Sequence, residues 1–372
     1  MNTPQDITIK RRLMSKAAHS KTPLCGIFEL TPRCNMNCKM CYIRMSEEEM
    51  KPFGKEKTAD EWISFGKECT EKGMLFLLLT GGEPFIRPDF HKIYSAFKAM
   101  GLFLSINTNA VLITDDDIDF LKKDRPESVN ITLYGASNET YKKLCRIENG
   151  FSKVTENIIK LKKADIPVAI NVSMTKENVS DLEAIINFGK KNDIPVKVSS
   201  YMFNPVRKTD GNQKCDDVIF SAKESGKVRY LTMKYVLPDE KFQFVCSQFR
   251  KNDFSVGVHG DECEFVQGYN MNCMAGKCSF WITWSGKMLP CGMINEPCAL
   301  PFENGFDGAW KFITDKVEKI TLAPECRNCP AISVCHPCGA MAFSENRNFS
   351  KKPEYLCEST KEYIRLMKSD SE

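Results

Sequence analysis

Six short apolar runs alternate with amphipathic stretches over residues 24–197, and this rhythm constrains the fold more than any other feature. Helix start signals follow some of the runs: Thr58-x-x-Glu61 and Ser180-x-x-Glu183 are typical capping boxes, and Thr114 with Asp117 resembles one. Near-continuous apolar strands in series with helices predict a parallel α/β sheet covered on both faces. Six units predict a partial (β/α)6 TIM-like barrel rather than a closed one, with strands at 26–30, 75–80, 102–107, 129–133, 168–172 and 196–199.

Three cysteines, Cys34, Cys38 and Cys41, follow the first predicted strand with three and then two residues between them. Thiolates so spaced can hold one face of a [4Fe-4S] cube and leave the fourth iron open to a small molecule. A zinc knuckle that lacks its fourth ligand is the alternative. Because the loops after parallel strands share one face, we expect this loop to meet the turn at residues 80–84, Thr-Gly-Gly-Glu-Pro. The carboxylate of Glu83 in that turn can accept hydrogen bonds from an ammonium group.

The chain has 18 cysteines in 372 residues, and its N-terminus lacks the apolar core of a secretory signal. We therefore expect a cytoplasmic protein whose cysteines bind metal rather than form disulfides. The formal charge of +4 is nearly balanced, and no run approaches the length of a membrane span, so neither nucleic acid nor membrane is an expected partner. Seven scattered cysteines are expected to be small buried hydrophobes: Cys25, Cys69, Cys145, Cys215, Cys246, Cys263 and Cys298.

The last third of the chain contains eight further cysteines, enough for two complete sets of four ligands. The alternating residues 280–284 and 287–290 around Ser285-Gly286 predict a β-hairpin that would hold Cys278 near Cys291. On spacing alone, two structural zinc sites compete with iron–sulfur clusters. Before the hairpin, a helix is possible at 217–224, whereas residues 230–265 show no clear period and are interpreted as part of a bridge that carries substrate contacts.

The first cysteine set, followed by residues 81–84 in a β/α frame, resembles the radical S-adenosylmethionine (SAM) superfamily over residues 22–200. The resemblance implies that the open iron binds the amino and carboxylate groups of SAM. One departure is Met40, which stands where the family usually has an aromatic residue against adenine; a thioether can still pack on a ring face. The SAM contacts implied by the resemblance are Met40, Gly81, Gly82, Glu83, Pro84, Asn109, Thr132 and Arg146.

The later cysteines resemble the SPASM extension of that superfamily, over residues 272–357. The family's last internal spacing is usually x3, whereas Cys335 and Cys338 are separated by two residues. The implied domains are an N-terminal extension (1–23), the barrel (24–215), a bridging region (216–272) and an auxiliary-cluster domain (273–372). The resemblance implies one auxiliary [4Fe-4S] cluster on Cys273, Cys278, Cys291 and Cys338, and another on Cys326, Cys329, Cys335 and Cys357.

The same resemblance implies an oxidoreductase that cleaves SAM to a 5′-deoxyadenosyl radical and oxidatively modifies a peptide or protein side chain, as a cross-link, thioether or epimer. Formylglycine formation of the sulfatase-maturase type is the first alternative, and it is disfavoured because Gly292 rather than an aspartate follows Cys291. A non-enzymatic electron carrier or zinc module is the second. We expect a monomer reduced by a donor such as a flavodoxin or ferredoxin.

The 23 N-terminal residues are too few for the peptide-recognition domain that many peptide maturases carry. A leader peptide would then be held by the barrel, the bridge or a separate protein. The sequence identifies no catalytic acid or base, and Tyr134, Asp261, Glu262 and His336 are the residues that could be considered for that role.

Overall fold

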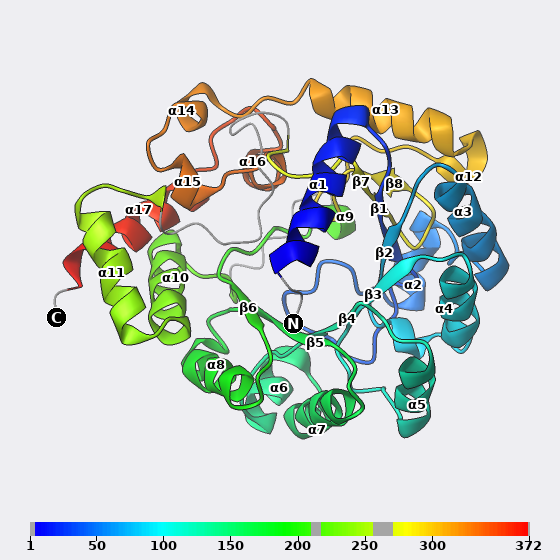
Figure 1. Cartoon of the computed structure of the whole chain (residues 1–372), viewed down its shortest axis with the longest axis horizontal. Helices are drawn as coiled ribbons and strands as arrows, with labels where there is room; N and C mark the ends of the chain where they lie inside the picture. The colour runs from blue at the N-terminus through cyan, green and yellow to red at the C-terminus, as the bar shows by residue number, and fades with distance from the viewer. Residues whose placement is uncertain (1–3, 210–216, 256–270, 371–372) are drawn as a thin grey trace.

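The computed structural model describes residues 4–209, 217–255 and 271–370, and it contains one sheet of eight strands in the order β6-β5-β4-β3-β2-β1-β7-β8. The first six strands are parallel, and each lies within two residues of its predicted position. Because β6 and β8 form two separate edges, the sheet is a partial barrel, as predicted (Figure 1). The six strands are β1 (Cys25–Glu29), β2 (Phe76–Thr80), β3 (Phe103–Thr108), β4 (Ser128–Thr132), β5 (Val168–Ser173) and β6 (Val196–Ser199).

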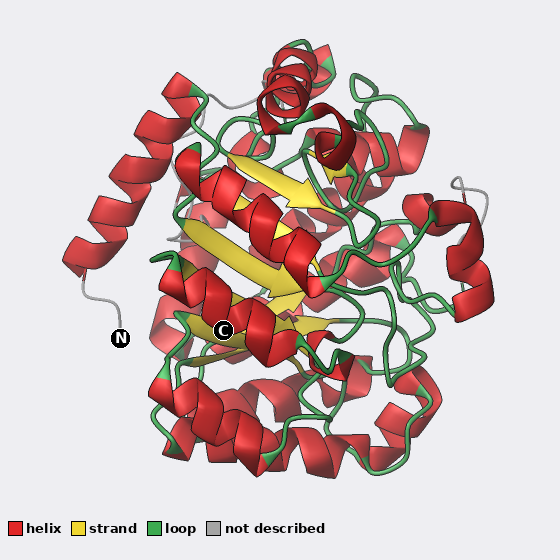
Figure 2. Cartoon of the chain, turned by 90° about the vertical axis from the view of Figure 1, so that its right-hand side faces the viewer, coloured by secondary structure: helices red, strands yellow, loops and turns green. Residues whose placement is uncertain are grey.

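Helices cover the outer face of this sheet and enclose the strands (Figure 2). Phe28 of β1 packs against Trp62 and Phe65 of α3 and against Phe97 of α4, with ring centroids 5.1–5.8 Å apart. These contacts give the barrel an aromatic core between sheet and helices. The covering helices are α3 (Ala59–Glu71), α4 (Phe90–Ala99), α5 (Asp115–Lys123), α6 (Asn138–Cys145), α7 (Gly150–Lys163) and α8 (Leu182–Lys191).

Two of the three predicted helix starts are confirmed. Thr58 and Thr114 each form a capping box. The prediction at Ser180 is wrong, because α8 begins at Leu182 after a 3-10 turn. The carboxylate of Asp181 instead accepts hydrogen bonds from the Ala136 amide (2.8 Å) and from a threonine hydroxyl of α6. A long-range contact therefore overrides the local capping signal.

The predicted hairpin is confirmed as β7 (Ser279–Ile282) and β8 (Met288–Leu289), which are antiparallel. The sequence did not indicate where this hairpin lies in the sheet. Strand β7 pairs in parallel with β1, with Cys25 opposite Ser279, so the hairpin extends the barrel sheet. The segment that carries the later cysteines is thereby brought beside the strand that leads into Cys34.

Two helices lie where the sequence showed no clear period: α10 (Ala222–Val236) and α11 (Asp239–Arg250). Helix α10 packs closely on α17 (Glu354–Ser369) through small residues, since a side chain on Gly226 would meet the Ser359 carbonyl at 2.4 Å, and the Ser225 and Ser359 hydroxyls lie 3.0 Å apart. Beyond this close approach, Tyr230 and Met233 of α10 pack in one apolar cluster with Tyr363 and Met367 of α17.

The remaining helices lie around the C-terminal half and at the barrel ends. Helix α1 (Pro4–Ser20) lies at the amino ends of the strands, where Lys10 is placed over the Phe76 ring (Figures 1 and 2). No helix in the described part of the chain has the length and apolar character needed to span a membrane. The other helices are α2 (Glu47–Met50), α9 (Val206–Thr209), α12 (Pro301–Asn304), α13 (Phe306–Glu318), α14 (Pro324–Arg327), α15 (Ile332–Cys335) and α16 (Gly339–Asn346).

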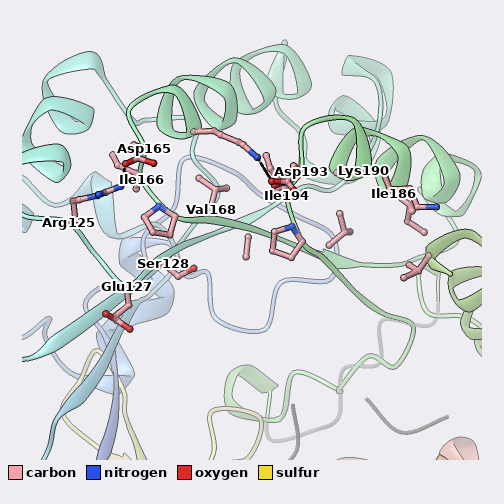
Figure 3. Close-up of a pocket in the computed structure, with 17 residues that line it drawn as sticks. Arg125, Glu127, Ser128, Asp165, Ile166, Val168, Ile186, Lys190, Asp193 and Ile194 are labelled. Atoms are coloured by element: carbon pink, nitrogen blue, oxygen red, sulfur yellow. Dashed lines mark hydrogen bonds and ion pairs between the residues drawn. The ribbon is translucent and has the colours of Figure 1, made fainter. Parts of the chain in front are cut away.

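A cavity of about 900 Å³ lies at the amino ends of β4, β5 and β6 (Figure 3). Its rim is charged, and Arg125 pairs there with Asp165 at 2.8 Å. This is the end of the barrel opposite to the loops that follow the strands, where active sites of such folds lie. We therefore place the reaction elsewhere.

Candidate active site

A second cavity, of about 360 Å³, lies at the carboxyl ends of the strands. Five successive strands, β2 to β6, each end on a hydroxyl residue that lines it: Thr80, Thr108, Thr132, Ser173 and Ser199. The sequence analysis singled out only Thr132. A hydroxyl at the end of every apolar run was the signal that could have identified the other four.

The loop that carries Cys34, Cys38 and Cys41 forms one wall of this cavity. Two backbone hydrogen bonds of 3.0 Å, from the amides of Asn37 and Lys39, attach the loop to the end of α6. Backbone amides also donate to the Cys34 sulfur (3.4 Å) and to the Cys41 sulfur (3.2 Å). Such donors stabilise thiolates, which are the form that binds iron.

Burial raises the pKa of the Cys34 thiol to about 12, and burial likewise raises that of Cys41. Cys38 is raised too, first by its hydrogen bond with Cys145 and then by burial. Without a cation these thiols stay protonated, so the arrangement is suited to metal rather than to free nucleophilic thiolates. Within residues 4–209, 217–255 and 271–370, no three His, Cys, Asp or Glu side chains converge on a position for a single metal ion.

The turn after β2 contributes Gly81 and Gly82 to the cavity, whereas Glu83 is not among the residues that line it. The Glu83 carboxylate is fully buried and accepts hydrogen bonds from the Thr108 hydroxyl (2.8 Å), the Asn109 amide (2.7 Å) and the Phe85 amide (3.1 Å). Burial raises its pKa to about 7. The carboxylate therefore joins the turn after β2 to the turn after β3, and its predicted contact with an ammonium group stays a prediction.

The two glycines are required by the close approach of the segment that leads into Cys34. A side chain on Gly82 would meet the carbonyl oxygen of Arg33 at 2.3 Å and that of Pro32 at 2.7 Å. The Gly82 amide donates to the Thr31 carbonyl (2.7 Å), and the following amide donates to the Arg33 carbonyl (2.9 Å). The glycine turn and the cysteine loop therefore support each other.

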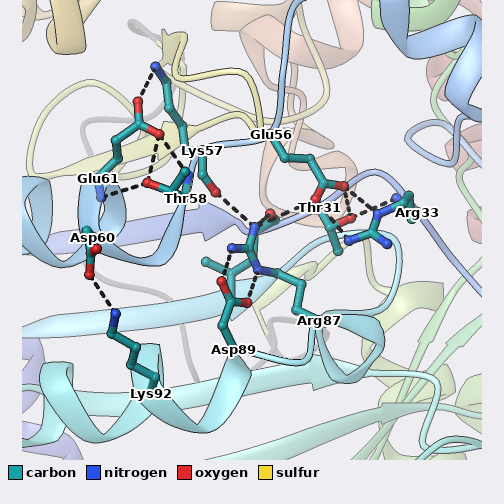
Figure 4. A network of polar contacts seen from close by, with 11 residues as sticks. Thr31, Arg33, Glu56, Lys57, Thr58, Asp60, Glu61, Arg87, Asp89 and Lys92 are labelled. Carbon is teal, nitrogen blue, oxygen red and sulfur yellow. Dashed lines mark hydrogen bonds and ion pairs between the residues drawn. The ribbon is translucent and has the colours of Figure 1, made fainter.

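A polar network fixes the same segment from its other side (Figure 4). The Glu56 carboxylate accepts from the Thr31 hydroxyl (2.5 Å) and from the Arg33 guanidinium (2.8 and 3.0 Å). Arg87 donates to the Leu30 carbonyl (2.8 Å), and its guanidinium is held by Asp89. The backbone just before Cys34 is thus anchored by side chains that do not reach the cavity.

The structure brings most of the predicted SAM contacts to this cavity. Met40, Gly81, Gly82, Asn109 and Thr132 line it. Asn109 also donates to the Asn35 side chain (2.8 Å) and so braces the cysteine loop.

Other predicted residues lie outside the lining. Pro84 is buried at the start of a 3-10 turn, and Arg146 is exposed at the end of α6. Among the residues considered as acid or base, Tyr134 lines the cavity and His336 does not. Asp261 and Glu262 lie outside the described residues.

The later cysteines form two groups, the first of which contains Cys273, Cys291 and Cys338. The thiols are close enough for Cys273 and Cys291 to raise the pKa of Cys338, although burial is the larger cause. Each sulfur also receives a backbone amide at 3.4–3.5 Å. The structure therefore brings three half-buried thiols together in this group.

Cys278, the predicted fourth member of this group, is fully buried and packs with Ala17, Leu24 and Met274. The hairpin pairs Trp281 with Leu289 and Ile282 with Met288, so Cys278 and Cys291 both lie beyond its paired residues. The expectation that the hairpin holds Cys278 near Cys291 stays a prediction.

The second group comes together around the start of α17. Cys326 lies close enough to Cys357 and Cys329 for their charges to add to the rise in its pKa that burial causes. Cys335 lies close to Cys357 and Cys326 on the same evidence. Burial is the largest cause and raises the pKa of Cys335 to about 11. The four residues that the resemblance assigned to one cluster are thus neighbours in the structure.

Among the scattered cysteines, Cys69, Cys145 and Cys246 are fully buried, as expected, whereas Cys25 and Cys298 are half-buried. Cys215 and Cys263 lie outside the described residues.

Comparison with known proteins agrees with this geometry. Residues 28–189 match the Radical SAM superfamily. This match contains the cysteine loop and the glycine turn. The match implies a [4Fe-4S] cluster and SAM as cofactors, and the cysteine loop, the glycine turn and the cavity between them fit that pair.

Two curated relatives match beyond the barrel. The chain is 25% identical to the AdoMet-dependent heme synthase of Methanosarcina barkeri, over 91% of this chain and 97% of that protein. It is 26% identical to the PqqA peptide cyclase of Bradyrhizobium diazoefficiens, over 76% and 70%. Among solved structures, Streptococcus suis SuiB bound to its precursor peptide SuiA has a TM-score of 0.65 at 16% identity, covering 96% of this chain and 82% of SuiB. The similarity to SuiB shows that the two proteins share a fold along nearly the whole of this chain.

Proposed function

We propose that this radical SAM enzyme oxidatively modifies a side chain of a peptide or protein, forming a cross-link, a thioether or an epimer. The observation that carries the proposal is the neutral cavity at the carboxyl ends of β2 to β6, where the three-cysteine loop faces strand-end hydroxyls. The relationship to a PqqA peptide cyclase and the shared fold with a SuiB–precursor peptide complex support a peptide substrate.

In the proposed enzyme, Cys34, Cys38 and Cys41 hold the [4Fe-4S] cluster, and the glycine turn with Asn109 and Thr132 holds SAM. When bound, these cofactors supply a 5′-deoxyadenosyl radical that removes a hydrogen atom from the substrate. The protein positions the two partners and excludes water. Apolar side chains suited to water exclusion are present in the lining: Met36, Met40, Met202, Phe203 and Met293.

For a cross-link or a thioether, the second half of the reaction needs an electron acceptor, because the substrate radical that closes the new bond must lose one electron and a proton. An epimer forms instead when the radical receives a hydrogen atom. We propose that the two later cysteine groups hold auxiliary [4Fe-4S] clusters that accept the electron. The group at Cys273, Cys291 and Cys338 is the nearer candidate, since Met293, two residues after Cys291, lines the cavity.

Haem formation is a second candidate, because the heme synthase relative spans nearly the full length of both chains. The cavity lining favours the peptide. None of the described residues that line it is Lys or Arg, and a porphyrin bearing carboxylates needs cations for recognition. Formylglycine chemistry is disfavoured by Gly292, since a side chain there would meet the Trp281 ring at 2.4 Å, leaving no room for an aspartate.

The test is anaerobic reconstitution of the full chain with iron and sulfide, followed by dithionite and SAM, with either a pool of synthetic peptides or a carboxylate-bearing porphyrin. We expect 5′-deoxyadenosine to form, and a peptide to change in mass or chirality. Cys34→Ala should abolish cleavage, and Cys298→Ala, at a half-buried cysteine outside the three groups, should retain it. Zinc in place of about twelve irons, with no 5′-deoxyadenosine, would refute the enzyme, and turnover of the porphyrin alone would select the second candidate.

A further inference from the structure

A buried ion pair lies between the radical site and the first group of later cysteines. Glu29, the last residue of β1, is fully buried and accepts two hydrogen bonds from the Arg207 guanidinium, at 2.6 and 3.1 Å. The Trp281 indole donates to the same carboxylate at 2.5 Å. The Arg207 side chain is only 11% exposed. A bidentate pair with so little water around it has a fixed geometry and is weakly screened.

Each end of this pair approaches one cysteine group. On one side, the guanidinium lies over the ring of Tyr42, 5.4 Å from its centroid, and Tyr42 directly follows Cys41. On the other side, Trp281 is in close contact with Gly292, which directly follows Cys291. Arg207 and Cys291 lie near enough for their charges to interact. The pair therefore connects two sites that are 250 residues apart in the sequence.

We propose that the Glu29–Arg207 pair sets the reduction potential of an iron–sulfur cluster bound at Cys291, with Arg207 as the charge that favours the reduced cluster. The inference rests on the proposed function, because it needs an auxiliary cluster at this position. Neither residue touches the substrate cavity, so both are positioning residues for electron transfer rather than catalytic residues.

The sign of the effect follows from where the charges lie. Reduction adds one negative charge to a cluster, and the guanidinium, which stays protonated in proteins, attracts that charge. The opposing Glu29 carboxylate has its charge spread over hydrogen bonds from Arg207 and from the Trp281 indole. Arg207 raises the potential at Cys291, and the cluster becomes a better acceptor for the electron of the substrate radical. Lys277 is a second cation near this group, beside Cys273, and acts in the same direction.

The experiment is an EPR-monitored redox titration of the anaerobically reconstituted full chain. Arg207→Met removes the cation and should lower the midpoint potential of the auxiliary cluster. Glu29→Gln removes the anion and should raise it. The double variant should lie between the two single variants. Arg125→Gln, in an exposed ion pair with Asp165 at the far end of the barrel, is the control and should leave the potential unchanged.

Shifts of opposite sign in the midpoint potential distinguish an effect of charge from structural damage. If the pair served only to hold β1, α9 and β7 together, both single variants would open the same contact, admit the same water and shift the potential in the same direction. Such a result, or no shift, would overturn the inference. If Arg207→Met fails to incorporate iron, Arg207→Lys keeps the charge without the bidentate geometry, and it should titrate close to the wild type.

A different result would refute the proposed function itself. A wild-type protein that reconstitutes with about four irons per chain and shows one cluster signal has no auxiliary cluster to tune. If all clusters are present and neither substitution changes the midpoint potential of the auxiliary cluster, the proposed function stands. Only the role of Glu29 and Arg207 is then refuted.

Discussion

Replacement of Gly82 by alanine is the most direct test of how the active site is assembled. The new methyl group would lie 2.3 Å from the Arg33 carbonyl oxygen and 2.7 Å from that of Pro32. Both contacts are backbone atoms, and the segment that contains them is fixed by Glu56 on its other side. The methyl group cannot be accommodated by a side-chain rotation, so the turn after β2 and the cysteine loop must move apart.

The loss of folding stability caused by Gly82→Ala has two parts. Separation breaks the hydrogen bond from the Gly82 amide to the Thr31 carbonyl and the next one, from the Glu83 amide to the Arg33 carbonyl. At about 1 kcal/mol each, these account for about 2 kcal/mol. Overpacking against a fixed backbone adds roughly 1–3 kcal/mol. We therefore expect Gly82→Ala to lower the free energy of unfolding by about 4 kcal/mol, a large share of the stability of a typical domain.

The assay is urea unfolding of the metal-free protein, so that cluster loss does not enter the result. Gly308→Ala is the matched control, because a methyl group at Gly308 in α13 meets no atom within 4 Å, and alanine favours a helix by up to about 1 kcal/mol. Equal stability of the two variants would refute the close packing of turn and loop. After reconstitution, Gly82→Ala should also bind less iron at the first cysteine set than Gly308→Ala does.

Two further predictions concern buried groups of the sites. Burial raises the pKa of Glu83 to about 7 from its usual 4.5, so the folded state binds this proton more tightly than the unfolded state. The free energy of unfolding of the metal-free protein should then fall as pH rises from about 4.5 to about 7, by up to roughly 3 kcal/mol, and Glu83→Gln should remove that part of the pH dependence. Cys278→Ala should cost the reconstituted protein less iron than Cys291→Ala; equal losses would show that Cys278 is a ligand and that the segment before β7 rearranges when the cluster binds.

Local patterns were sufficient to predict the barrel and its first cysteine loop. Apolar runs and capping signals identified six strands and two helix starts, because strand burial and the capping of α3 and α5 depend on neighbours in sequence. The capping box predicted at Ser180 failed for the opposite reason. The Asp181 carboxylate accepts hydrogen bonds from the Ala136 amide and from a threonine hydroxyl of α6, and both partners are distant in sequence. The position of the cysteine loop followed from topology, since loops after parallel strands share one face.

Long-range pairing was not predictable from the sequence. The hairpin was identified, but its addition to β1 was not, because any exposed strand edge offers the same backbone partners. The positions of Cys278 and Cys291 are not set by that hairpin alone, because both residues lie beyond its paired residues. Helix α10 was missed over most of its length, and its partner α17 is more than 100 residues away in the sequence, with close contacts at Ser225 and Gly226.

Three carboxylates with partners distant in sequence have a structural role that the sequence analysis did not predict. Glu56 anchors the segment before Cys34, Glu83 joins the turns after β2 and β3, and Glu29 joins β1 to β7 and α9. None of the three lines the cavity. A charged residue at the end of an apolar strand, as at Glu29, is costly to bury unless it is paired, and each of these carboxylates is paired where two site-bearing segments meet. Residues that do not line the cavity therefore fix its geometry. Substitutions of these carboxylates should loosen the radical site without removing any of its ligands.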